Sequence, residues 1–272
     1  MTSESPVVSI IIPCFNQGKY IEETIKSVLS STFKNFEIII VNDGSTDTHT
    51  NRLLQHLNLE SVIVIQTENQ GVSNARNTAI RNSRGKFILP LDADDKISVR
   101  YIEEAVKILE ANSNIKVVTS EVELFGAASG KMSLLDYSIE NLLCQNTMVC
   151  SSIFRREDFD RTMGFNPEMK HGFEDWDFWL SILGEGGNVF KIPMVHFYYR
   201  IKRNSRNTDF ARKADQLKQG RYQIYKNHID LYSNHFLDPA KSFEFDLIQK
   251  SKEYKIGKAI LKPVRYFFNL LR

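Results

Sequence analysis

Apolar positions along the first 120 residues alternate between two spacings. Five short runs are apolar at nearly every position, which is typical of strands buried on both faces of a parallel sheet. These runs are Val7–Ile12, Phe36–Val41, Ser61–Ile65, Lys86–Leu91 and Ile115–Ser120. Between them, helical spacing predicts helices over Tyr20–Ser31, Leu53–Leu57, Val72–Asn82 and Tyr101–Ala111. The alternation predicts βαβ units, and therefore an α/β fold with a doubly wound, mostly parallel sheet.

The pattern becomes less regular after Glu121. We predict a small-residue loop at Gly126–Gly130, strands at Met148–Phe154, Val189–Ile192 and His196–Arg200, and a helix at Trp176–Leu183. From about Asp209 the spacing is helical to the end, with breaks at Pro239 and Pro263. These changes predict one α/β domain over 1–205, with halves 1–120 and 121–205, and a helical C-terminal extension over 206–272.

The composition is that of an ordinary globular protein, since 42% of the 272 residues are hydrophobic and 25% are charged. The formal net charge of +2 gives no reason to expect binding to nucleic acid. Cys14, Cys144 and Cys150 show no Cys-x-x-Cys spacing, which argues against a disulfide framework or a zinc site. The N-terminus is short and polar, and no apolar run approaches the ~20 residues that span a membrane. These features predict a soluble, cytoplasmic protein.

The basic residues are concentrated near the C-terminus. Residues 250–272 contain seven Lys or Arg and a single acid, Glu253. On a helical wheel, one side gathers Ile256, Ile260, Val264, Phe267, Phe268, Leu270 and Leu271, and Lys258, Lys262, Arg265 and Arg272 lie opposite. Such a helix is typical of the surface of an anionic membrane. It is equally typical of an amphipathic helix packed on the domain or on a partner subunit, so a peripheral location at the inner face of the cell membrane stays open.

Polar loops follow four of the predicted strands. In an open α/β sheet, ligands bind beyond the carboxyl ends of the strands, which here are the loops 13–16, 42–47, 68–71 and 92–95. The last loop, Asp92-Ala93-Asp94-Asp95, holds three carboxylates in four residues. The repulsion between these carboxylates is tolerable when they share a divalent cation with a diphosphate. The alternative is a solvated acidic turn. The sequence has no P-loop, so metal-bridged phosphate binding remains open.

A second acidic site lies at the start of the predicted helix around Trp176. Glu174 and Asp175 are adjacent there, between Phe173, Trp176 and Trp179. Apolar walls raise the proton affinity of a carboxylate, so one of these acids can act as a general base toward a sugar hydroxyl. The alternative is that both acids only stabilise the helix N-terminus and the aromatic residues belong to the core.

Five segments together resemble the ordered motifs of glycosyltransferase family 2. They are Ser9–Asn16, Val41–Asp47, Asn69–Gly71 with Ala75–Asn77, Leu91–Asp95 and Phe173–Trp176. Each motif is short, but five in this order and spacing, over Val7–Arg203, are specific. The resemblance implies the GT-A fold and an inverting, nucleotide-sugar-dependent transferase. In such an enzyme 1–120 binds the nucleotide sugar and 121–205 forms the acceptor side.

The resemblance also implies roles for individual residues. The residues expected to contact the nucleotide sugar are Pro13, Phe15, Asn16, Asp43, Asn69, Arg76, Asp92 and Ala93, with Asp43 reading the base and Asp92 facing the ribose. Asp94 is expected to bind Mg²⁺ or Mn²⁺, and Asp175 is expected to be the base beside Glu174. The acceptor side is expected to include His171, Phe173 and Trp176.

Two positions depart from the family's pattern. Asn42 stands where many members have an acid, which leaves Asp43 as the only acid before the glycine. The Tyr-Arg pair of the last predicted strand is often followed by His, but here Ile, Lys202 and Arg203 follow it. We expect Lys202 and Arg203 to contact the diphosphate by charge. The Gln-x-x-Arg-Trp signature of processive polysaccharide synthases is missing, which favours the addition of single sugars.

We therefore predict transfer of one sugar from a UDP- or dTDP-type donor to a hydroxyl of a glycan. The expected acceptor is a lipid-linked oligosaccharide of surface polysaccharide biosynthesis. One alternative is a nucleotidyltransferase, which should show a basic, Gly-rich loop near the N-terminus, yet residues 13–18 contain no arginine. Another is an inactive sugar- or nucleotide-binding module, and the presence of both Asp94 and Asp175 argues against it.

Overall fold

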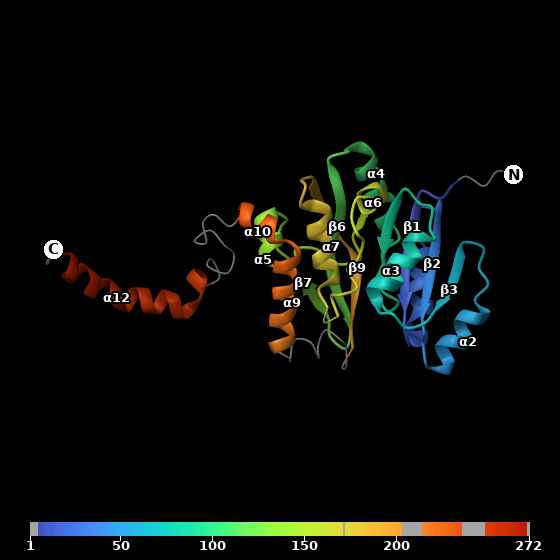
Figure 1. Cartoon of the computed structure of the whole chain (residues 1–272), viewed down its shortest axis with the longest axis horizontal. Helices are drawn as coiled ribbons and strands as arrows, with labels where there is room; N and C mark the ends of the chain where they lie inside the picture. Colours follow the sequence, from blue (N-terminus) through green and yellow to red (C-terminus); the bar gives the residue numbers. More distant parts are fainter. Residues whose placement is uncertain (1–4, 171, 203–213, 236–247, 271–272) are drawn as a thin grey trace.

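The fold is organised around one mixed sheet of nine strands. The computed structural model describes residues 5–170, 172–202, 214–235 and 248–270. Along the sheet the strands follow the order β3 (Val62–Thr67), β2 (Phe36–Asp43), β1 (Val8–Cys14), β4 (Phe87–Pro90), β8 (Ile153–Arg155), β6 (Ile115–Gly126), β9 (Asn188–Ile201) and β5 (Lys96–Ile97). Strand β7 (Gly130–Met132) pairs with β6 at the side. Helices cover both faces of this sheet (Figure 1). The prediction of a doubly wound α/β fold is confirmed.

The first half of the sheet is parallel. Its strands are β1 (Val8–Cys14), β2 (Phe36–Asp43), β3 (Val62–Thr67) and β4 (Phe87–Pro90), joined by the helices α1 (Gly18–Leu29), α2 (Thr48–His56) and α3 (Val72–Arg81). These elements coincide with the predicted ones to within a few residues. Strand β1 lies between β2 and β4, so the order in which strands are added to the sheet reverses beside β1. Open α/β sheets bind their ligands at such a point.

The second half is mixed, with antiparallel pairs on both sides of β8. It contains β5 (Lys96–Ile97), β6 (Ile115–Gly126), β7 (Gly130–Met132), β8 (Ile153–Arg155) and β9 (Asn188–Ile201), together with α4 (Tyr101–Ala111), α5 (Ile139–Cys144), α6 (Arg156–Asp160) and α7 (Glu174–Leu183). The predicted strand at Met148–Phe154 is mostly loop. The short elements β5, β7, α5 and α6 were not predicted, because they are too brief to show a period.

Strand β9 corrects the prediction of two separate strands in this region. It is continuous over Asn188–Ile201 and pairs in parallel with β6. Ser120 pairs with Ile192 and Glu121 pairs with Val195, so Pro193 lies in a bulge. Proline is tolerated at such a bulge because the ladder needs no donor from it there. The interruption in the sequence is therefore a bulge within one strand.

Neighbouring residues of the central strands are buried on opposite faces of the sheet. Ile10 and Ile12 of β1 join a core with α1 and α4, and Ile11 joins a second core with α3 and α7. All three side chains have 0% exposure. Pro13 fits the same central strand because β4 ends at Pro90, opposite Ile11, and leaves no neighbour that needs its missing N–H.

The C-terminal extension consists of two parts that differ in their contacts. Helices α9 (Ala214–Asn227) and α10 (Ile229–His235) lie beside α7, and Ile224 is fully buried in the second core. Helix α12 (Lys252–Leu270) is set apart from the sheet and its helices (Figure 1). Its residues from Lys252 to Pro263 are exposed, except Gly257, which is partly exposed. Pro263 lies inside this helix, and Pro239 lies outside the described residues.

No helix among the described residues is both long enough and apolar enough to cross a membrane.

Candidate functional site

The loop after β1 and the loop after β2 are held together by the side chain of Asn16. Its Oδ1 accepts hydrogen bonds from the backbone N–H groups of Thr46 (2.8 Å) and Asp47 (3.0 Å). Asn16 has a φ of 55°, a left-handed conformation that asparagine tolerates better than most residues. Phe15, next to it, is 42% exposed and Pro13 is buried in β1. Of the residues predicted here for the nucleotide, Phe15 and Asn16 reach the surface.

Asp43 fastens the loop after β2 to the loop after β3. Its Oδ1 accepts from the N–H of Gln70 at 2.8 Å, and its Oδ2 accepts from the N–H of Gly71 at 2.9 Å. Gly44 packs so closely that a Cβ there would lie 2.5 Å from the backbone nitrogen of Asn69. Asn69 itself is exposed on this loop. The predicted contact between Asp43 and a base would use a carboxylate that already shapes the neighbouring loop.

The acidic loop after β4 is tied to the end of β9. Asp94 forms an ion pair with Lys202, whose Nζ lies 2.5 Å from Asp94 Oδ2. The Asp94 carbonyl accepts from Arg200 Nε at 2.7 Å, and Asp95 Oδ1 accepts from the Arg200 backbone N–H at 2.7 Å. Ala93, which lies between Asp92 and Asp94 in the sequence, is buried. The structure thus brings Asp94 and Lys202 together, which lie 108 positions apart in the numbered sequence.

Burial raises the pKa of two acids of this loop, Asp94 and Asp95. The pKa of Asp94 is raised by burial and by the charge of Asp92, and the nearby Lys202 opposes that shift. The pKa of Asp95 is raised well above its ordinary value by burial and by the charges of Asp94 and Asp92. A bound cation would relieve this repulsion.

The donor atoms of this loop fit a hard divalent cation. Mg²⁺ and Mn²⁺ need only one or two protein carboxylates when phosphate oxygens and water complete their coordination. Asp94, with Asp92 two residues before it, can supply those oxygens. Within the described ranges, no group of three or more His, Cys, Asp or Glu is arranged to hold a metal by itself. The loop therefore suits a cation that arrives with a diphosphate.

Arg76 lies beneath the site and joins its two acidic regions. Its guanidinium is 2.7 Å from Asp92 Oδ1 and 3.1 Å from Glu174 Oε1, and its side chain is 2% exposed. It also lies over the ring of Phe165, with 5.3 Å between Cζ and the ring centroid. Arg76 was predicted to contact the nucleotide. Its burial and both ion pairs give it a structural task as well, which is to hold α3, the acidic loop and α7 together.

Asp175 stands in the first turn of α7, as predicted for a pair of acids at a helix start. Its Oδ2 accepts from Asn146 Nδ2 at 2.9 Å, and its Oδ1 accepts from the N–H of Trp176 at 2.9 Å. Burial, reinforced by the charge of Glu174, raises the pKa of Asp175 to about 6. A carboxylate of this pKa is mostly ionised at neutral pH and still accepts a proton readily.

The residue before this pair has an unusual backbone. Phe173 has a φ of 65°, which is rare for a bulky residue and persists only where the surroundings enforce it. Its ring packs edge-on against Trp176, with ring centroids 5.5 Å apart. Trp176 is 3% exposed and its indole N–H donates to the Leu142 carbonyl at 2.5 Å. Trp176 therefore supports the helix from inside the protein, whereas Phe173 is only partly buried.

The predicted site residues and the neighbours seen in the structure differ at a few positions. His171 and Arg203 lie outside the described residues. Asn146 was missed because a single asparagine in an irregular loop gives no sequence signal. Cys150 was also not predicted. Burial raises its pKa well above the ordinary value, the charges of Asp92, Asp175 and Glu174 add to this shift, and the charge of Arg76 opposes it. The functional roles assigned from sequence stay predictions, and the geometry shows which of these residues are neighbours.

The arrangement of the sheet and its helices matches that of solved GT-A glycosyltransferases. Residues 1–349 of Staphylococcus aureus TarS, solved with UDP-GlcNAc, superpose with a TM-score of 0.64 at 19% identity, over 84% of this chain and 73% of that one. A mannosyltransferase from Pyrobaculum calidifontis, solved with GDP-Man and Mn²⁺, gives a TM-score of 0.58 at 17% identity, over 94% of this chain and 84% of that one. At these identities the likeness shows the fold, which is GT-A.

The sequence itself assigns the family. The model of "Glycosyl transferase family 2" matches residues 9–166, so the chain belongs to that family and is a glycosyltransferase. An uncharacterized glycosyltransferase of Haemophilus influenzae is 28% identical over 94% of this chain and 84% of its own length. A putative teichuronic acid biosynthesis glycosyltransferase of Bacillus subtilis, TuaG, is 29% identical over 75% of this chain and 83% of its own length. The family resemblance found in the motifs is confirmed.

Proposed function

We propose that this glycosyltransferase transfers a single sugar from a UDP- or dTDP-type donor to a hydroxyl of a glycan, with inversion at the anomeric carbon. The acceptor is a lipid-linked oligosaccharide of surface polysaccharide biosynthesis. Family membership supports the class of reaction, and the relationship to TuaG supports a surface polysaccharide. The TarS complex with UDP-GlcNAc supports a nucleotide-sugar donor, although the mannosyltransferase was solved with GDP-Man.

The contrast between the two neighbouring acids of α7 carries the mechanistic part of this proposal. Glu174 is ion-paired to the buried Arg76 at 3.1 Å, so a fixed cation already occupies its side chain. Asp175 instead accepts hydrogen bonds from a side-chain amide and a backbone N–H, and its pKa is about 6. A general base works best when its pKa lies near the working pH. This supports Asp175, and not Glu174, as the base.

The step that follows from this assignment is a single displacement. An oxygen of the Asp175 carboxylate takes the proton of the acceptor hydroxyl as that oxygen bonds to the anomeric carbon of the donor. The bond from this carbon to the diphosphate breaks, and the diphosphate leaves with the electron pair. Because attack and departure occur on opposite faces of the sugar ring, the configuration inverts.

On the donor side, the residues at the strand ends are proposed to bind the nucleotide diphosphate. Phe15, Asn16 and Asp43 line the base and Asp92 faces the ribose, in the region where β1, β2 and β4 end. Asp94 would hold Mg²⁺ or Mn²⁺, which offsets the charge that builds on the departing diphosphate. Lys202, which is paired with Asp94, brings a second positive charge to the same place.

Helix α12 is proposed to bring the enzyme to the inner, anionic face of a membrane, where a lipid-linked acceptor would be found. Ile256 and Ile260 are 58% and 65% exposed, and Lys252, Lys255 and Lys258 are exposed on the same helix. An exposed apolar face with flanking lysines suits the interface of an anionic bilayer. On this proposal the protein is cytoplasmic and peripheral to the membrane.

The function is tested by donor turnover in the absence of a known acceptor. We expect UDP or dTDP, but not every nucleotide of a panel, to raise the melting temperature further with Mn²⁺ than with chelator. The matching nucleotide sugars should be hydrolysed slowly to the free sugar. Proton NMR at early times should show the anomer opposite to that of the donor. Release of the same anomer, or no response to any nucleoside diphosphate, would contradict the proposal.

A further inference from the structure

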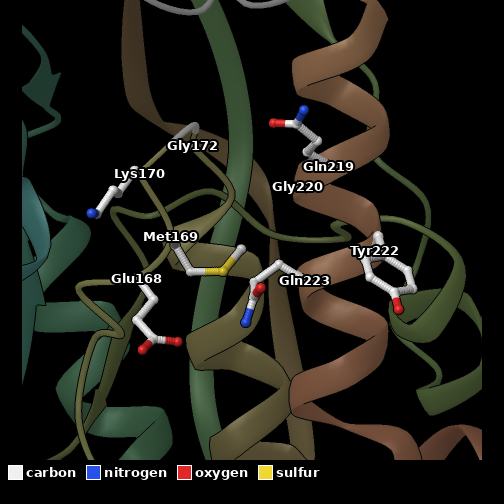
Figure 2. A pocket seen from close by; sticks show the side chains of 8 residues that line it. All are labelled: Glu168, Met169, Lys170, Gly172, Gln219, Gly220, Tyr222 and Gln223. Atoms are coloured by element: carbon white, nitrogen blue, oxygen red, sulfur yellow. The ribbon is translucent and has the colours of Figure 1, made fainter.

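A cavity lies beside the loop that leads into α7. Its volume is about 310 Å³ (Figure 2). One wall is the backbone around Glu168, Met169 and Gly172, and the other wall is α9 with Gln219 and Gln223. Helix α9 lies outside residues 9–166, which the family model matches. This wall therefore lies beyond the part of the chain that the family model matches.

The wall formed by α9 is held firmly against the catalytic half. Arg221 Nη2 donates to the Cys144 carbonyl at 3.0 Å. Asn227 Nδ2 donates to Asp177 Oδ1 at 2.7 Å, which fastens the end of α9 to α7. Ile224 has 0% exposure. With an anchor on both sides of Gln223, the cavity is a built feature and its shape does not depend on a loose helix.

The cavity is close to the proposed base. Gly172 lines it, and Asp175 follows three residues later in the first turn of α7. Three Cα–Cα steps of about 3.8 Å place the two Cα atoms within about 11 Å of each other. The nucleotide loops lie at the ends of other strands, β1, β2 and β4. A molecule bound in this cavity would thus lie near the start of α7, on the side where α9 packs.

The lining is chemically suited to a sugar. Figure 2 shows the side chains of Gln219 and Gln223 between α9 and the loop of Glu168 and Met169. Amides and a carboxylate offer the donors and acceptors that sugar hydroxyls require, and Met169, which is 5% exposed, supplies apolar surface. Glu168 and Lys170 carry opposite charges, so the cavity has no excess charge to attract a phosphate.

We propose that this cavity binds a neutral sugar unit of the acceptor glycan, one that is not itself the reacting unit. Gln219 and Gln223 are then specificity-determining residues that choose the acceptor. The inference rests on the proposed function, because it assumes that Asp175 receives a hydroxyl from an acceptor on this side. It adds that the acceptor is recognised as a carbohydrate chain by α9, and not through its lipid alone.

The test uses the full-length protein and four probes, the p-nitrophenyl β-glycosides of glucose, galactose, N-acetylglucosamine and N-acetylgalactosamine. Binding is measured by saturation-transfer NMR in the presence of UDP and Mn²⁺. Gln219→Trp fills the cavity and Gln223→Ala removes its amide, and Gln55→Ala changes an exposed glutamine of α2 as the matched control. At least one glycoside should bind the wild type, and both cavity variants should weaken it at least fivefold. UDP affinity should stay unchanged in all variants.

The outcomes separate this inference from the proposed function. Glycoside binding that is equal in wild type, Gln219→Trp and Gln223→Ala would overturn the cavity as an acceptor subsite. A wild type that binds UDP but none of the four glycosides would also overturn it, and would leave the transferase proposal standing. Failure of UDP binding and of donor hydrolysis in the wild type would instead contradict the proposed function itself.

Discussion

The two halves of the molecule build their parts of the site in different ways. In the parallel half, the functional loops directly follow buried strands. Hydrogen bonds from backbone N–H groups to the side chains of Asn16 and Asp43 shape these loops. In the mixed half, Asp175 stands on a helix whose start requires a left-handed Phe173. The buried Arg76 joins the halves by pairing with Asp92 in one and Glu174 in the other. Adjacent strand ends thus position the loops after β1, β2 and β3, whereas contacts that span 98 to 106 positions fix the acidic loop and the start of α7.

Removing the link between the halves should have the largest effect. Arg76→Ala leaves Glu174 buried without its cation, and breaking a buried ion pair in this way typically costs about 3–5 kcal/mol. We expect the free energy of unfolding, measured by urea titration, to fall by about that amount. Arg81→Ala, at an exposed position of the same helix, is the control and should change it little. A loss below about 1 kcal/mol for Arg76→Ala would show that the halves hold together without this link.

Changing the base should affect turnover without affecting the donor side. Asp175→Asn removes the proton acceptor, and loss of a positioned base typically lowers the rate by about 10²–10⁴-fold. Donor hydrolysis should fall by that factor, while calorimetry shows the same UDP affinity as wild type. Asp230→Asn, at an exposed position of α10, serves as the matched control. More than about a tenth of wild-type turnover in Asp175→Asn would refute the assignment.

The ion pair between Lys202 and Asp94 allows the metal prediction to be tested without measuring turnover. A cation that binds Asp94 must compete with the Lys202 ammonium, which is 2.5 Å away. The loop suits a cation that arrives with a diphosphate, so Mn²⁺ binding without nucleotide should be weak. Lys202→Ala should still tighten this weak binding by about tenfold, since hydrogen bonds to charged groups are worth about 1.5–3 kcal/mol. Asp94→Ala should lose the binding, and Lys26→Ala, at an exposed position of α1, should leave it unchanged. Free Mn²⁺ is measured by electron paramagnetic resonance, and equal affinity in all four proteins would exclude Asp94 as a ligand.

The acid side of the pH profile should report the environment of Asp175. This base must be ionised to work, so kcat/KM should fall as the pH drops through about 6. Asn146 donates to the carboxylate and favours its charged form, so Asn146→Ala should move this limb toward higher pH by about one unit. Asn114→Ala, at an exposed position before β6, should leave the limb in place. A limb that stays fixed, or moves to lower pH, in Asn146→Ala would contradict the assignment.

The smallest expected effect concerns α12, which belongs to neither half of the sheet. Full-length protein should co-sediment with anionic liposomes at low salt and dissociate as salt is raised, because screening shortens the reach of its charges. Truncation after Ser251 should abolish co-sedimentation and leave the melting temperature of the core unchanged. Liposome binding that survives the truncation, or a core that no longer folds, would show that α12 acts by packing.

The two halves also differ in how much of their structure could be predicted from the sequence. Strand β1 and the Asp92–Asp95 loop were predictable because a buried parallel strand and the turn after it occupy consecutive positions. The pairing of Arg76 with Glu174 spans 98 positions, and no local period encodes it. The same applies to Asn146, whose partner Asp175 is 29 positions away. The cavity beside α9 depends on how α9 packs against α7, which helical spacing alone does not specify.

The ties from Arg200 to the acidic loop have a consequence for the order in which the protein becomes competent during synthesis. Arg200 contacts the carbonyl of Asp94 across 106 positions, so the loop that should carry the cation lacks its support until β9 has been made. At about 5–20 residues per second, the loop would wait roughly 5–20 s on the ribosome after its own residues are joined. Throughout that interval the nascent chain has its parallel strands and its three aspartates, but no finished donor site. The ability to bind the donor is therefore acquired late in synthesis, when β9 joins the sheet.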